Sequence, residues 1–208
     1  MTTPTPPRAT PPRTAPQGRR RSVPANPPKG SPPKVSLRLE DRAWARALPE
    51  VRPMLTRAAK AAFAAGRGHL PVLDQAAGPL EIDLTLSSDE VVRRLNHQWR
   101  GKDKPTNVLS FPGIDAAGLA RLPKAAPCPL GDVILALGTC TQEAAEQRKT
   151  LAAHAQHLVV HGVLHLLGYD HEDEGQAQEM EGLERQVLAG LGVADPYALA
   201  DHPAEAVR

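Results

Sequence analysis

The chain has 208 residues, 41% of them hydrophobic but only 3% aromatic, so it can form one ordinary domain whose core consists mainly of Ala, Leu and Val. Every apolar run is shorter than the roughly 18 residues of a membrane-spanning helix, and residues 1–30 lack the apolar centre of a secretory signal peptide. The formal charge is +2. The two cysteines, Cys128 and Cys140, form no CxxC pattern, which favours a protein of the reducing cytoplasm, and no membrane partner is expected.

The first 34 residues differ in composition from the rest of the sequence. They contain seven of the 25 basic residues, none of the 23 acidic residues and 11 of the 22 prolines. Such a segment lacks the residues of a core, so we expect a disordered tail over residues 1–34. Its charge suits non-specific RNA binding, although an organelle-targeting peptide or a leader without function has the same composition. The folded domain is expected over residues 35–200, followed by a flexible C-terminus over residues 201–208.

The first part of the domain is predicted to alternate strands with helices. Residues 35–39 and 80–86 alternate between apolar and polar side chains, which indicates strands with one buried face. Residues 52–65 carry apolar side chains at helical spacing. Ser88 is a suitable N-cap for a second helix over residues 89–99, because its hydroxyl can accept a hydrogen bond from a free amide of the first turn. The apolar residues of that helix are Val91, Val92, Leu95 and Trp99.

A basic turn follows, with the sequence RGKDKPTNVLSF over residues 100–111. The guanidinium of Arg100 can donate two parallel hydrogen bonds to a phosphate, which a lysine cannot do. Lys102 and Lys104 add positive charge. The alternative interpretation is a solvated turn whose cations are favourably placed at a helix C-terminus.

The remaining elements complete the predicted fold. Strands are expected over residues 107–111 and 132–137, joined by a long link rich in Ala, Gly and Pro that is either functional or disordered. Helices are expected over residues 141–149, 151–167 and 176–191. The side chains of the last helix that are expected to face inward are Ala177, Met180, Leu183, Val187 and Leu191. The pattern predicts an α+β fold: a single domain with a roughly four-stranded mixed sheet packed on helices, the helices concentrated toward the C-terminal end.

Three histidines in the segment HGVLHLLGYDH, residues 161–171, are spaced for one metal ion. His161 and His165 lie one helical turn apart on the same face. Gly168 stands where the helix would end, because glycine adopts the left-handed conformation easily, and the returning chain can bring His171 to the same point. Three imidazoles without a fourth protein ligand are typical of a catalytic zinc site, in which water fills the open position. The sequence therefore predicts a metal site on the C-terminal helix and the turn after it.

Other interpretations of the histidines stay open. A pair of histidines at this spacing on an apolar helix is often only a buried, hydrogen-bonded pair. His154 and His157 lie on the same helical face and can support the ligands or cap the helix. A ligand set of His157, His161 and His165 is less suitable, because three side chains along one straight helix do not converge on a tetrahedral ion.

The two long motifs together resemble the YbeY family of bacterial endoribonucleases. Residues 161–171 are similar to its HGxLHLxGYDH signature, and residues 100–111 match its RGKDxPTNVLSF segment. Leu130-Gly131-Asp132 and Asp195-Pro196-Tyr197 resemble its LGD and DPY motifs. The resemblance covers roughly residues 35–198.

The resemblance implies an α+β zinc-dependent endoribonuclease that acts on single-stranded RNA, in maturation of small-subunit ribosomal RNA and in ribosome quality control. Carried over by position, His161, His165 and His171 bind one Zn²⁺ per chain, and Arg100 is the arginine needed for activity. Partners would be small ribosomal subunit RNA and, among proteins, ribosomal proteins or an assembly GTPase.

The same motifs leave two alternative functions open. A metalloprotease-like hydrolase is disfavoured, because Gly162 stands where HExxH proteases place their general-base glutamate. A non-catalytic ribosome-assembly factor would use zinc to hold the C-terminal helices together while the basic turn binds RNA. The general base of the hydrolase stays unassigned, since Asp170 can equally orient a ligand histidine.

Overall fold

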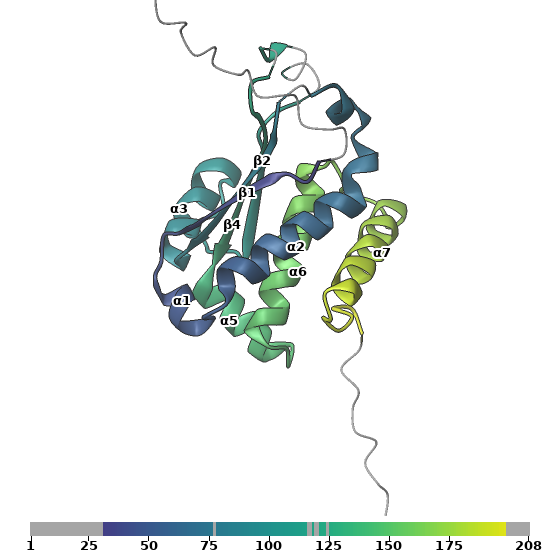
Figure 1. Ribbon diagram of the computed structural model, residues 1–208. Coiled ribbons are helices and arrows are strands. Elements are labelled where there is room, and N and C mark those ends of the chain that lie inside the picture. Colours follow the sequence, from purple (N-terminus) through teal and green to yellow (C-terminus); the bar gives the residue numbers. More distant parts are fainter. Residues whose placement is uncertain (1–30, 77, 116–117, 119–120, 124, 199–208) are drawn as a thin grey trace, which may run out of the picture.

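The computed structural model describes residues 31–198 with the exception of residues 77, 116–117, 119–120 and 124 (Figure 1). Most of the predicted tail over residues 1–34 and all of the predicted flexible end over residues 201–208 lie outside the described residues. None of the helices in the described part of the chain combines the length and the hydropathy that a bilayer crossing requires.

Four strands of the described chain form one mixed sheet, as the sequence predicts. Their order across the sheet is β1 (Lys34–Leu39), β2 (Leu80–Ser87), β4 (Cys128–Ala136) and β3 (Val108–Pro112). β1, β2 and β4 run parallel to one another, whereas β3 is antiparallel to β4 and forms one edge. The outer side of β3 therefore pairs with no other strand of the described chain.

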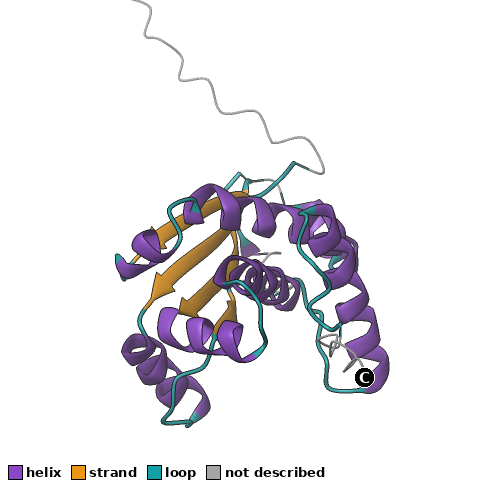
Figure 2. Cartoon of the chain, turned by 90° about the horizontal axis from the view of Figure 1, so that it is seen from below, coloured by secondary structure: helices purple, strands orange, loops and turns teal. Residues whose placement is uncertain are grey.

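Helices cover both faces of this sheet (Figures 1 and 2). α2 (Val51–Gly66) and α6 (Leu151–Leu166) pack in the main core, and α7 (Glu174–Gly190) packs against these two helices. α3 (Asp89–Arg100) contacts β3 and β4 through a smaller cluster that contains Val92, Leu109 and Ala136. The shorter elements are α1 (Ala43–Ala47), α5 (Leu137–Glu146) and the 3-10 helices Arg67–His69 and Pro71–Gln75. α6 thus lies between the sheet and α7.

Several predicted boundaries differ from the structure. α5 begins at Leu137, directly after β4, rather than at residue 141. The carboxylate of Asp89 from α3 accepts hydrogen bonds from the Thr139 backbone N–H at 3.0 Å and from its hydroxyl at 3.2 Å. This cap comes from a residue distant in sequence, which local signals do not show. β4 also begins earlier than predicted, at Cys128, so that part of the predicted long link is strand.

The two cysteines are buried, reduced residues of the core. Cys128 and Cys140 are both buried and free. Burial raises the pKa of the Cys128 thiol, and burial together with the nearby carboxylates of Glu143 and Asp89 raises the pKa of Cys140 to about 12. Both thiols therefore stay protonated and unreactive near neutral pH.

Candidate metal centre

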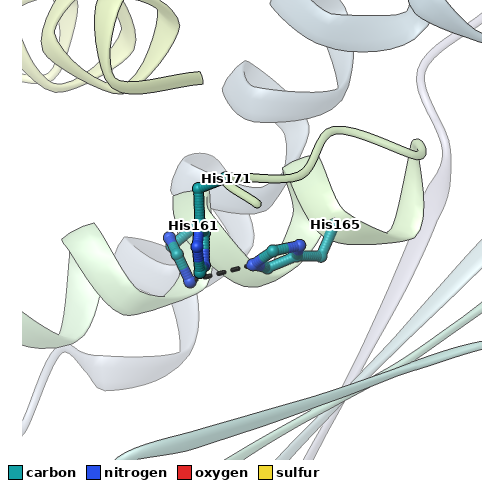
Figure 3. A group of neighbouring side chains, drawn as sticks. All are labelled: His161, His165 and His171. Atoms are coloured by element: carbon teal, nitrogen blue, oxygen red, sulfur yellow. Dashed lines mark hydrogen bonds between the residues drawn. The ribbon is translucent and has the colours of Figure 1, made fainter. Parts of the chain in front are cut away.

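Three imidazoles converge at the C-terminal end of α6 (Figure 3). His161 and His165 project from consecutive turns of the helix, and His171 comes from the segment that follows it. Gly168 has a φ of 90°, which lets the chain reverse here as the sequence predicts. One ring nitrogen from each histidine lies within 4.8 Å of the other two, so this group can hold a metal ion.

Hydrogen bonds on the outer side of two rings fix the orientation of their lone pairs. His161 Nδ1 lies 2.8 Å from Glu184 Oε1, and His165 Nδ1 lies 3.0 Å from the Tyr169 carbonyl oxygen. Because both partners are acceptors, each Nδ1 carries the proton and each Nε2 carries a lone pair. The two Nε2 atoms face each other across 3.0 Å (Figure 3). A cation relieves this repulsion, and tetrahedral zinc with Zn–N of about 2.0–2.1 Å separates two ligand nitrogens by about 3.3 Å.

The residue behind the site is Glu184, a fully buried carboxylate of α7. Its oxygens accept hydrogen bonds from His161 Nδ1 and His157 Nε2, both at 2.8 Å, and from the Tyr197 hydroxyl. Burial alone would raise the pKa of Glu184, but these three donors lower it to about 2. The carboxylate is therefore ionised, and its charge increases the basicity of the His161 ring toward a metal.

The other two histidines of α6 form supporting contacts. His157 points its Nε2 at Glu184 Oε2, so it shares this carboxylate with His161 and is not part of the converging set. His154 Nε2 lies 2.9 Å from Glu143 Oε2 on α5, and the same oxygen accepts a hydrogen bond from Asn107 Nδ2 at 2.8 Å. The structure thus links the histidine helix to the start of β3 through a second carboxylate.

The three histidines open into a cleft of about 440 Å³, and Arg100 lines the same cleft. Arg100 is the last residue of α3 and is exposed, and its guanidinium makes no ion pair with any residue that the structure describes. The opposite wall consists of alternate residues of β3, namely Val108, Ser110 and Pro112, preceded by Thr106 and Asn107. The two sequence motifs, which are distant along the chain, therefore meet at one cavity.

Gly162 explains how closely α6 approaches this wall. A Cβ atom at residue 162 would lie 2.7 Å from Val133 Cγ1 and 3.0 Å from Ser110 Oγ, closer than normal packing allows. A glutamate at this position would point into the sheet rather than toward the histidines. Residue 162, where HExxH proteases have their general base, thus packs against the strands and leaves no room for a glutamate side chain.

Asp170 also lines the cleft, where its role is to hold the backbone. Its Oδ1 accepts a hydrogen bond from the His171 backbone N–H at 2.8 Å. The side chain thus stabilises the turn that presents His171, and its recorded contact is with the main chain rather than with a ligand ring.

Sequence reasoning missed the residues that support the ligands. Glu184 was assigned to no role, although it lies between Met180 and Val187, two positions predicted to face inward, and a carboxylate at an inward position is a usable signal. Glu143 has no such signal. Tyr197 belongs to the DPY motif, but its contact with Glu184 depends on the chain folding back after α7.

Comparison with known proteins agrees with this geometry. The family model described as Endoribonuclease YbeY matches residues 53–192. A protein named Endoribonuclease YbeY from Azorhizobium caulinodans is 50% identical over 174 residues, covering 83% of this chain and 99% of that protein. Another of that name, from Paramagnetospirillum magneticum, is 50% identical over 164 residues, covering 79% and 95%. The matched region contains Arg100, the three converging histidines and Glu184, and with this extent of similarity the chain belongs to the Endoribonuclease YbeY family.

Proposed function

We propose that this protein is a zinc-dependent endoribonuclease that cleaves single-stranded RNA, acting in maturation and quality control of the small ribosomal subunit. The observation that supports this most directly is that an exposed arginine and three imidazoles that could hold a metal ion share one open cleft. The names of the family and its relatives support RNA as the substrate.

Zinc is the proposed metal because three neutral imidazoles without a carboxylate or thiolate form a typical catalytic zinc ligand set. When bound, zinc would supply a Lewis acid for a phosphoryl oxygen and lower the pKa of a coordinated water toward about 7. Burial, and then the adjacent His161, lower the pKa of His165, which keeps its ring neutral and able to bind metal near neutral pH.

The protein side chains then position the scissile phosphate. The planar guanidinium of Arg100 would donate two hydrogen bonds to the non-bridging oxygens and neutralise the charge that develops on them in the transition state. Glu184 holds the His161 ring in place, and Asp170 holds the turn that carries His171. The cleft is open to solvent, so a flexible RNA strand can enter without unfolding the domain.

The test is cleavage of a 5′-labelled RNA by the full-length, zinc-loaded protein, with the same RNA annealed into a duplex as the matched control. Cleavage should be confined to the single strand, should stop on chelation and should return when zinc is restored. Circular dichroism of the chelated protein should show a folded domain, because the main core is built from α2, α6 and the sheet rather than around the ligands. Undiminished cleavage in chelator would exclude the metal mechanism. Unfolding on chelation, with RNA binding but no cleavage when zinc is present, would favour the assembly factor.

A further inference from the structure

Trp99 is a large apolar residue that is exposed to solvent. Its side chain, which the helical pattern grouped with buried residues of α3, is 64% exposed, and Tyr197 at 36% is the other large hydrophobic residue exposed in the described chain. Trp99 immediately precedes Arg100, the residue that reaches the cleft. The larger part of this residue is left uncovered by the described chain, so it is available to a ligand.

The indole is supported from beneath by the sheet. Its ring centroid lies 5.8 Å from that of Phe111, at an interplanar angle of 59°. Phe111 in turn packs against the cluster of Val92, Leu109 and Ala136 between α3 and the sheet. An exposed aromatic ring backed by a rigid strand is typical of surfaces that bind the flat faces of nucleobases.

The position of β3 connects this ring to the cleft. Alternate residues of the strand face opposite sides, so that Ser110 and Pro112 line the cleft while Phe111 supports Trp99. β3 is the edge strand, and no further strand pairs with its outer side. A chain leaving the cleft can therefore cross this edge and reach Trp99 directly.

The charges around Trp99 suit a polyanion. Arg100, Lys102 and Lys104 are exposed, and the structure shows no ion pair for any of them within the part of the chain that it describes. In contrast, Arg93 on the same helix is neutralised by Asp103, with Nε and Oδ1 2.7 Å apart. Arg100, which lines the cleft, and the two exposed lysines that follow it thus carry positive charge close in sequence to the exposed indole, where they can bind phosphates.

We infer that Trp99 is a stacking platform for an unpaired base of the RNA strand, next to the phosphate held in the cleft. This rests on the proposed function and deepens it. A base can stack on the indole only if it is free of a partner strand, so the platform contributes to selection of single-stranded RNA. Because every base has a flat face, it gives little preference for sequence.

The protein contains an internal reference for a direct test. It has two tryptophans, and the other one, Trp44, is fully buried. Stopped-flow mixing of the full-length, zinc-loaded protein with oligoadenylate should quench the emission of Trp99 before cleavage accumulates. In the Trp99→Leu variant the remaining emission, from Trp44, should not change on mixing. Equal quenching in wild type and Trp99→Leu, or none in the wild type, would overturn the inference.

Affinity provides the second measurement. Wild type should bind oligoadenylate about tenfold more tightly than a ribose-phosphate oligomer of equal length without bases, and Trp99→Leu should bind the two alike. Trp99→Phe, which keeps an aromatic face, should retain part of the difference. If Trp99→Leu still binds oligoadenylate more tightly than the oligomer without bases, the bases are bound elsewhere and the inference is wrong. Quenching without cleavage would refute the proposed hydrolysis but not the platform, and cleavage without quenching would refute the platform alone.

Discussion

Glu184 holds an ionised carboxylate in a fully buried position, and three donors compensate it, two from α6 and one from the segment after α7. Each donor also benefits: His161 is held in the tautomer that can bind metal, and His157 and Tyr197 are fixed behind it. The buried carboxylate needs all of these hydrogen-bond donors, because an unpaired buried charge is strongly destabilising.

Replacing Glu184 with Gln should weaken zinc binding about 10- to 100-fold, because the amide nitrogen that replaces one oxygen cannot accept a hydrogen bond from His157 or His161. Competition with a colorimetric chelator measures this affinity. Glu179→Gln, at an exposed position of the same helix, is the matched control and should bind zinc like the wild type. Equal affinity in all three proteins would show that Glu184 has no influence on the metal.

The depressed pKa of Glu184 also sets a pH dependence of folding. Its pKa falls from an ordinary 4.5 to about 2 in the folded protein, so its stabilising contribution is fully present above pH 4.5 and is lost as the pH falls toward 2. Urea unfolding of the metal-free wild type and of Glu184→Gln gives the free energy of unfolding of each protein. The difference between the two values should not decrease between pH 7 and pH 5 but should be smaller at pH 3. A difference that decreases already between pH 7 and pH 5 would contradict this assignment.

Arg100 should affect chemistry without affecting folding. Its side chain is exposed and forms no ion pair in the described structure, so Arg100→Ala should reduce RNA cleavage strongly while zinc content and melting temperature stay nearly unchanged. Arg100→Lys should restore activity only in part, since lysine cannot make the two-pronged phosphate contact. Single-turnover kinetics and elemental analysis measure the two effects. Full activity in Arg100→Ala would remove this residue from the mechanism.

At the scale of elements, the approach of α6 to the sheet positions the ligands. Gly162→Ala should lower the stability by about 1–3 kcal/mol, because its methyl group would clash with Val133 and Ser110. Gly182→Ala in α7, where a Cβ meets nothing within 4 Å, is the matched control and should instead raise stability by up to about 1 kcal/mol. Thermal unfolding of both variants measures this. A Gly162→Ala protein as stable as the wild type would show that the helix can shift without cost.

The elements also show how far local sequence determines this structure. The four strands and the long helices α2, α3, α6 and α7 were predicted to within a few residues, because each has a strong alternating or helical pattern. α1 was missed because five residues are too few for a periodicity, although its Trp44 is fully buried. The early start of α5 depends on Asp89, which lies 50 residues away along the chain.

The residues of the site also fall into those that local sequence predicts and those that it does not. His161, His165 and His171 could be found from sequence because their spacing within one segment already defines a shared position. Glu184 and Glu143 could not be given roles, because each acts on a histidine only after α7 or α5 has packed against α6. Their function is a property of the tertiary contacts.

For the whole molecule, removing residues 1–30 tests whether the N-terminal segment contributes to RNA binding while the domain alone carries out cleavage. The deletion removes six basic side chains, whereas every residue of the cleft lies later in the chain. The truncated protein should fold, bind zinc and cleave saturating RNA at a similar maximal rate. It should bind RNA more weakly and with a shallower salt dependence, because fewer counterions are released. Cleavage assays over a range of salt concentrations measure both effects. Loss of turnover by a folded, zinc-loaded truncation would place the tail in the active site.

The three converging histidines lie close together in sequence, which affects the order in which the site assembles. The three histidines and Glu184 all fall within residues 161–184, so closing this unit orders only a short loop, and the entropic cost is small. Arg100 reaches the cleft only after α3 and β3 have joined the sheet, which requires contacts between distant parts of the chain. We therefore expect a partly folded chain, in which α6 and α7 have packed together but the sheet has not formed, to acquire metal before it can cut RNA. Destructive activity would then appear only in the finished domain.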